Sequence, residues 1–110
     1  MIGKRPGIFI YSHQGDSGIL REICAGIEEE GLFYEIIDKQ GSIDELAYQA
    51  SAESMLGCGI GIIKNKVAMQ MQPLPQGNHI FAVENPSPEQ SRALGANSAR
   101  GVKRMPFRAV

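Results

Sequence analysis

Tryptophan is absent from the 110-residue chain, aromatic residues make up 6% of it, and cysteine occurs only twice. Cys24 and Cys58 lie in apolar surroundings without a CxxC pair or a histidine–cysteine cluster, which predicts reduced core thiols and neither a disulfide nor a zinc site. The longest apolar run without a charge covers residues 55–63, whereas a membrane-spanning helix needs about 20 residues. We therefore expect a cytoplasmic protein that does not cross a membrane.

The rest of the composition is that of an ordinary folded domain. Apolar residues make up 43% of the chain and charged residues 21%, which excludes disorder, a coiled coil and a collagen-like repeat. This length supports one hydrophobic core, so residues 1–110 are predicted to form a single domain.

Charge is unevenly distributed, although the net charge is only −1. Between residues 16 and 53, ten acidic residues stand against two basic ones, a balance of −8, and from residue 89 onward five basic residues stand against one acidic residue, a balance of +4. This asymmetry favours docking onto a protein surface of complementary charge, and the acidic first half argues against nucleic acid as the main partner.

The first half of the chain predicts alternating strands and helices. Residues 7–12 form an apolar strand, and either Asp16 or Ser17 caps an amphipathic helix that ends near Gly31. A second strand follows at residues 32–37.

The second half completes an α/β arrangement. A capping box opens a helix at residue 42, and strands are predicted at residues 58–63, 67–71 and 80–83, the middle one returning antiparallel after a tight turn. Ser87, Pro88 and Gln90 begin a last helix. In that helix Gly95 and Gly101 indicate either a break or close packing. The order β-α-β-α-β-β-β-α predicts a three-layer sandwich with a five-stranded mixed sheet.

Three consecutive acids, Glu28, Glu29 and Glu30, end the first helix at the negative end of its dipole, where carboxylates are unfavourable. They form either a solvated helix end or a site for a cation, either a hard metal or a partner's arginine. Since one helix end cannot complete a six-oxygen shell, a metal would need ligands from another chain or from water. The last helix carries four bases that are either solvated or face a phosphate or an acidic protein surface: Arg92, Arg100, Lys103 and Arg104.

Three other features carry less weight. Glycines 57, 59 and 61 lie at the entry to a strand and inside it, not in a strand-to-helix turn, so close packing is favoured over phosphate binding. His13 lies in the first β-to-α loop, where no nucleophile and orienting acid accompany it. His79 borders a Pro/Gly loop and is expected to be solvated.

Two segments make the chain recognisable: R-E-I-C-A-G-I-E-E-E-G at residues 21–31 and L-G-A-N-S-A-R-G-V-K at residues 94–103, with G-I-G-I in the third strand. Together they resemble the small subunit of the diol/glycerol dehydratase-reactivating factor over nearly the whole chain. The resemblance implies a fold similar to the medium subunit of B12-dependent diol dehydratase, of the anticodon-binding-domain-like kind.

The resemblance also implies a non-catalytic, chaperone-like function. In that family the small subunit pairs with a large, Hsp70-like ATPase subunit, which binds ATP or ADP, in a heterotetramer of two large and two small subunits. The complex transiently binds a coenzyme B12-dependent dehydratase whose cobalamin is damaged. The small subunit leaves, the dehydratase's medium subunit takes its place, and the damaged cofactor is released.

For the site, the resemblance implies that Glu29 donates one ligand to a magnesium ion shared with the large subunit, with Glu28 or Glu30 as alternatives. The implied partner interface contains Glu28, Glu29, Glu30, Arg92, Asn97, Arg100 and Lys103. The first loop reads S-H-Q-G-D and departs from some relatives, so no role is carried over to His13.

Two alternatives remain open. The chain could be a medium-subunit module of the dehydratase itself, although medium subunits carry additional segments. It could also be a small flavin- or nucleotide-binding α/β protein, although Asp16 in the first loop repels phosphate. The residues do not distinguish diol from glycerol dehydratase as the client, nor indicate a bacterial microcompartment or the oligomeric state of the isolated chain.

Overall fold

Residues 6–110 are described by the structure, a computed structural model. This part of the chain forms five strands and three helices in the predicted order. The elements are β1 (Gly7–His13), α1 (Ser17–Glu29), β2 (Phe33–Asp38), α2 (Ile43–Glu53), β3 (Cys58–Ile63), β4 (Lys66–Met71), β5 (Phe81–Glu84) and α3 (Pro88–Lys103).

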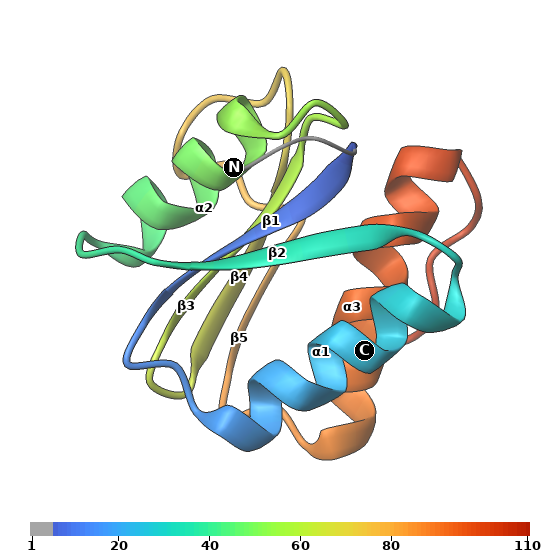
Figure 1. Ribbon diagram of the computed structural model, residues 1–110, viewed down its shortest axis with the longest axis horizontal. Helices are drawn as coiled ribbons and strands as arrows, with labels where there is room; N and C mark the ends of the chain where they lie inside the picture. The colour runs from blue at the N-terminus through green and yellow to red at the C-terminus, as the bar shows by residue number, and fades with distance from the viewer. Residues whose placement is uncertain (1–5) are drawn as a thin grey trace.

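The strands form one mixed sheet in the order β2-β1-β3-β4-β5. β1 pairs in parallel with β2 and β3, whereas β4 runs antiparallel to both β3 and β5. α2 covers one face of the sheet, and α1 and α3 lie together on the other (Figure 1). The predicted three-layer sandwich is confirmed, and the carboxyl ends of β1, β3 and β5 meet at one edge of the sheet.

The alternation of side chains along the strands divides the core in two. Under α1 and α3, buried isoleucines of β1 and β3 pack against Ile23, Ile27 and Leu94. Under α2, Phe9 and Tyr11 pack against smaller helix residues. At Gly59 and Gly61 of β3 an added Cβ would overlap the backbone of α2. The prediction that these glycines serve close packing is therefore supported by the geometry.

Each helix begins at its predicted cap. The Asp16 carboxylate accepts a hydrogen bond from the backbone N–H of Ile19 at 2.9 Å. Both predicted capping boxes are present, one between Ser42 and Glu45 and the other between Ser87 and Gln90. The helix starts are thus determined by local hydrogen bonds that the sequence already shows.

α3 runs without a break through Gly95 and Gly101, so of the two predicted possibilities close packing is correct. An added Cβ on Gly95 would overlap the carbonyl oxygen of Ile23 in α1, and one on Gly26 would overlap the carbonyl oxygen of Arg92 in α3. The backbones of α1 and α3 are therefore in direct contact at these two glycines. Any side chain larger than hydrogen at position 26 or 95 would push the helices apart.

The segment after α3 turns back along the helix. Fully buried Asn97 donates from Nδ2 to the carbonyl oxygen of Arg108 at 2.9 Å, and its Oδ1 accepts from the Arg108 backbone N–H at 2.6 Å. The Phe107 ring lies edge-on to Phe81, with ring centroids 5.4 Å apart. Asn97 thus holds the C-terminal segment through main-chain atoms.

We predict that Gly95→Ala lowers the free energy of unfolding by about 1–3 kcal/mol, because α1 and α3 must move apart to admit the methyl group. Gly101→Ala in the same helix is the control: there the added Cβ meets the flexible end of Met71, 2.7 Å away. Its effect should stay within about 1 kcal/mol, since the gain in helix propensity offsets a small rearrangement. Urea denaturation measures both variants, and a Gly95→Ala protein as stable as wild type would contradict the backbone contact.

Candidate functional site

α1 and α3 run side by side in the same direction, so that the acids of α1 face the bases of α3 (Figure 1). The Arg92 guanidinium lies between two carboxylates of α1. Its Nη2 is 2.8 Å from Oε1 of Glu22, and its Nη1 is 2.9 Å from Oε2 of Glu29. The neighbouring carboxylates, Glu22 first and then Glu29, raise the pKa of Arg92. One guanidinium therefore joins residues two helical turns apart on the neighbouring helix.

Glu30 is held more tightly than the other two acids at the end of α1. Its carboxylate lies 3.0 Å from Lys103 Nζ and 3.1 Å from Arg100 Nε, and Lys103 also donates to the Glu30 carbonyl oxygen at 2.8 Å. The hydrogen bond from Lys103 is the largest cause that lowers the pKa of Glu30, and Arg100 adds to it. The positive charges of Arg100 and Lys103 offset the unfavourable position of the Glu30 carboxylate at the negative end of the α1 dipole.

Glu28 and Glu29, by contrast, remain accessible. The Glu29 side chain is 51% exposed, against 13% for Glu30, and its ion pair with Arg92 uses only one carboxylate oxygen. Exposed Glu28 has a long contact, 3.5 Å, with the Tyr34 hydroxyl. The end of α1 thus has two accessible carboxylates, while the third is held by bases of the same chain.

The structure brings together five of the seven residues predicted for the partner interface. These five form the α1–α3 seam: Glu29, Glu30, Arg92, Arg100 and Lys103. Glu28 lies apart from them, and its carboxylate contacts the Tyr34 hydroxyl of β2. Asn97 does not join them at the surface, because it is fully buried and both ends of its amide are bonded to Arg108. Its position in the folded chain allows it to support the C-terminal segment but not to touch a partner directly.

The bases of α3 were predicted to be solvated or to face a phosphate or an acidic protein surface. The acidic surface is that of this chain's own α1, which neutralises Arg92, Arg100 and Lys103. Sequence reasoning missed the pairing because about 70 residues separate the partners. The available signal was the matching order of acids and bases on two helices that a parallel arrangement would align.

A metal ion bound here would need ligands from elsewhere. Within residues 6–110, no group of three or more His, Cys, Asp or Glu side chains is placed to hold a metal. Glu29 has a carboxylate oxygen outside its Arg92 bond, and Glu28 is exposed beside it. One or two carboxylates with other oxygen ligands suit magnesium, so the residues fit one part of a shared site.

His79 is a correction to the sequence analysis, because it is not solvated. Its side chain is 11% exposed, Nε2 lies 2.7 Å from Asp44 Oδ1, and Nδ1 lies 3.1 Å from Oε1 of buried Gln70. Gln70 in turn donates to the carbonyl oxygens of Leu74 and Pro75. The histidine connects the loop before β5 to the start of α2, which is a structural role.

The cysteines agree with their predicted role as core thiols. Cys24 and Cys58 are free and buried, and burial raises the pKa of Cys58 to about 12. No helix in the described part of the chain has the length and apolar character to span a bilayer.

Comparisons with known proteins identify the group to which this architecture belongs. The dehydratase medium subunit family matches residues 5–108. The propanediol dehydratase-reactivating factor small subunit of Citrobacter freundii is 32% identical over 106 residues, covering 94% of this chain and 90% of that protein. The diol dehydratase-reactivating factor small subunit of Klebsiella michiganensis is 33% identical over 105 residues, covering 94% and 84%. The chain belongs to this family of reactivating-factor small subunits.

Solved structures agree with the family assignment. A chain of the diol dehydratase-reactivating factor complexed with ADP and Mg²⁺ superimposes with a TM-score of 0.89 at 31% identity, covering 96% of this chain and all of that one (100%). A chain of a glycerol dehydratase reactivase gives a TM-score of 0.90 at 29% identity, covering 96% and 98%. The two segments that carried the resemblance, residues 21–31 and 94–103, are the ones that α1 and α3 place against each other.

The lowered pKa of Glu30 predicts a specific loss of stability in acid. Because the pKa is lower in the folded chain than in the unfolded one, the ionised carboxylate stabilises the fold above about pH 4.3, and this contribution is lost as the pH falls through the lowered pKa. Between about pH 5 and pH 3, Glu30→Gln should therefore lose less of its free energy of unfolding than wild type does. Glu28→Gln is the matched control, and urea denaturation across this range should show it following wild type.

Proposed function

We propose that the chain is the non-catalytic small subunit of an ATP-dependent, chaperone-like reactivating factor for coenzyme B12-dependent diol or glycerol dehydratase. A larger ATPase subunit binds ATP or ADP, and two large and two small subunits form the complex. The names of the similar proteins support the assignment to a reactivating factor. The complex of a similar factor with ADP and Mg²⁺ supports a nucleotide-dependent partner.

The mechanism we propose is an exchange of subunits. This chain leaves the large subunit, the medium subunit of the dehydratase occupies the vacated surface, and the opened dehydratase releases damaged cobalamin. The observation that carries this proposal is that a family named for the dehydratase medium subunit matches nearly the whole chain. Two proteins of the same fold can compete for one docking surface when their outer residues match.

In this proposal the docking surface is the accessible end of the α1–α3 seam. Glu29 donates one carboxylate oxygen to a magnesium ion shared with the large subunit, and Glu28 is the alternative ligand. Glu30 is disfavoured as the ligand because two bases already hold its carboxylate. Arg92, Arg100 and Lys103 hold the acids in place, and Asn97 supports the surface from beneath.

A pull-down of the tagged chain from its native lysate tests the assignment. We predict that the largest copurifying subunit is an ATPase much larger than this chain, and that added ATP with magnesium changes which proteins are bound. Recovery of a catalytic dehydratase subunit in its place would favour the alternative that the chain is a medium-subunit module. Recovery of flavin or free nucleotide with the isolated chain would favour a small ligand-binding protein.

Glu29→Gln tests the proposed ligand, because it removes the charge and keeps the shape of the side chain. We predict that association with the large subunit becomes at least tenfold weaker in the presence of magnesium and loses most of its dependence on magnesium concentration. Glu35→Gln on β2, outside the seam, is the matched control and should retain that dependence. Calorimetry or surface plasmon resonance across a magnesium titration measures this, and unchanged magnesium dependence in Glu29→Gln would exclude Glu29 as the ligand.

A further inference from the structure

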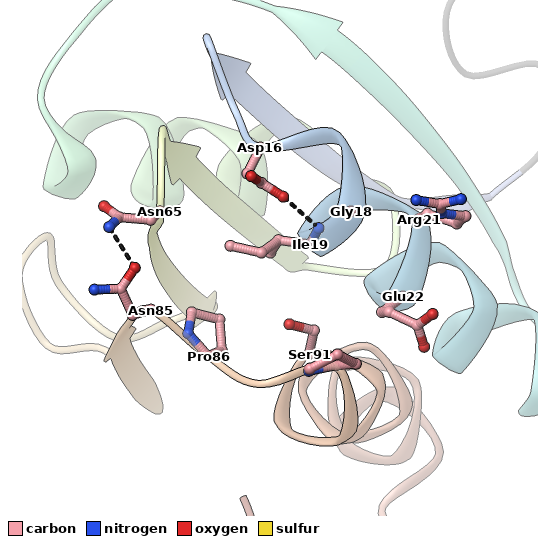
Figure 2. A pocket seen from close by; sticks show the side chains of 10 residues that line it. Asp16, Gly18, Ile19, Arg21, Glu22, Asn65, Asn85, Pro86 and Ser91 are labelled. Carbon is pink, nitrogen blue, oxygen red and sulfur yellow. Dashed lines mark hydrogen bonds between the residues drawn. The ribbon is translucent and has the colours of Figure 1, made fainter.

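A pocket of about 380 Å³ lies at the other end of the α1–α3 pair, between the first turns of the two helices (Figure 2). It opens at the edge of the sheet where β1, β3 and β5 end, the edge at which open α/β sheets commonly bind ligands. The turns at this edge contain three residues with a positive φ that are not glycine: Gln14, Lys64 and Asn85. The acids at the other end of α1 do not line the pocket, although Glu22, which does, shares Arg92 with Glu29.

At the base of the pocket lies a hydroxyl group without a partner. Ser91 of α3 is fully buried, and its Oγ is the one buried side-chain oxygen or nitrogen in the described part of the chain that makes no hydrogen bond. Figure 2 shows the hydroxyl in the gap between α1 and α3, on the side of Ile19 and Pro86. Buried hydroxyls are normally hydrogen-bonded, since leaving one unpaired costs stability. The Ser91 hydroxyl is therefore available to hydrogen-bond a group that enters the pocket.

The carboxylate available to a ligand in this pocket is that of Asp16. Glu22 and Arg21 also line the pocket, but Glu22 is already paired with Arg92. The capping bond of Asp16 uses Oδ1, which leaves Oδ2 for another donor. Figure 2 shows Arg21 on the opposite side of the first turn of α1 from Asn65 and Asn85. The helix N-termini would attract an anion, but the Asp16 carboxylate stands where that anion would bind.

Part of the pocket wall is apolar and is formed by Ile19, Pro86 and Pro88, while the amides of Asn65 and Asn85 line another part. A lysine side chain combines an aliphatic stem, which can pack on such walls, with three N–H donors at its end. The Asp16 carboxylate supplies the negative charge that such an ammonium group pairs with. The aliphatic stem, the N–H donors and the positive charge of a lysine side chain thus match the pocket.

We propose that this pocket binds a lysine side chain of a docking protein, with the ammonium group donating to the Asp16 carboxylate and the Ser91 hydroxyl. The stem lies against Ile19 and the prolines. The identity of the docking protein rests on the proposed function, whereas the chemistry of the pocket does not. The pocket adjoins the seam at Glu22 but does not include Glu29, so this contact is a second point of attachment.

Amide NMR of the intact chain during titration with n-butylammonium chloride tests the chemistry, because this cation has the stem and charge of lysine. Sodium chloride at equal ionic strength is the blank, and sodium phosphate is the anionic probe. We expect saturable shifts for the amides of Gly18, Asn85 and Ser91 with n-butylammonium only. Saturation at this pocket by phosphate, or shifts spread evenly over the surface, would overturn the proposal.

Two variants and one control test whether the pocket binds a cation or an anion. Asp16→Asn keeps a good helix cap but removes the charge, and should weaken binding of n-butylammonium at least threefold. Arg21→Gln removes the opposing charge and should strengthen binding about twofold, whereas an anion site would show the reverse in both variants. Glu89→Gln, in the same turn of α3 but outside the pocket, is the control and should match wild type.

Ser91→Ala separates binding from folding. If the hydroxyl serves a ligand, the variant loses at least threefold in n-butylammonium affinity while its Tm stays at or above the wild-type value. A lower Tm with unchanged affinity would show that Ser91 serves the fold and would overturn the proposal. Failure of the large subunit to copurify would refute the proposed function but leave the amine titration intact, so the two failures are distinguishable.

Discussion

The contact between the backbones of α1 and α3 sets the geometry on which the candidate site depends. Gly26 and Gly95 allow each helix to lie against a carbonyl oxygen of the other. This close approach sets the axial register of the two helices, and with that register Arg92 lies between Glu22 and Glu29 and two bases reach Glu30. A shift by one turn would separate these charges. The ion pairs of the seam therefore depend on the close helix contact that Gly26 and Gly95 allow.

The seam also changes the meaning of the charge asymmetry along the chain. The acidic first half and the basic end are complementary, and folding brings part of each together. Ion pairs near the surface contribute only about 0–1 kcal/mol each, so a half-exposed carboxylate such as Glu29 can exchange one positive partner for another at little cost. Arg92 would keep its contacts with Glu22 after such an exchange, since Nε and Nη2 both reach that residue.

Local features of the fold were predictable from the sequence because they depend on neighbouring residues. The Asp16 cap, the two capping boxes and the Pro88 start are all formed within a few residues, and the apolar run at residues 58–63 is typical of a central strand. The pairing of Glu30 with Lys103, the burial of His79 and the bonds of Asn97 depend on residues far apart in the chain. Periodicity carries no information about such contacts. The acids at the end of α1 were therefore predicted as a site, but which of them remain accessible required the structure.

The way in which Asn97 holds the end of the chain has a consequence for how this region can change. Its amide contacts only the N–H and C=O groups of Arg108, and every amino acid except proline has both. The contact therefore does not depend on the side chain at position 108, whereas it requires the amide of Asn97. Any residue except proline at position 108 can accept and donate these two bonds, so the path of the C-terminal segment is set by a side chain of α3 and not by the side chain at position 108.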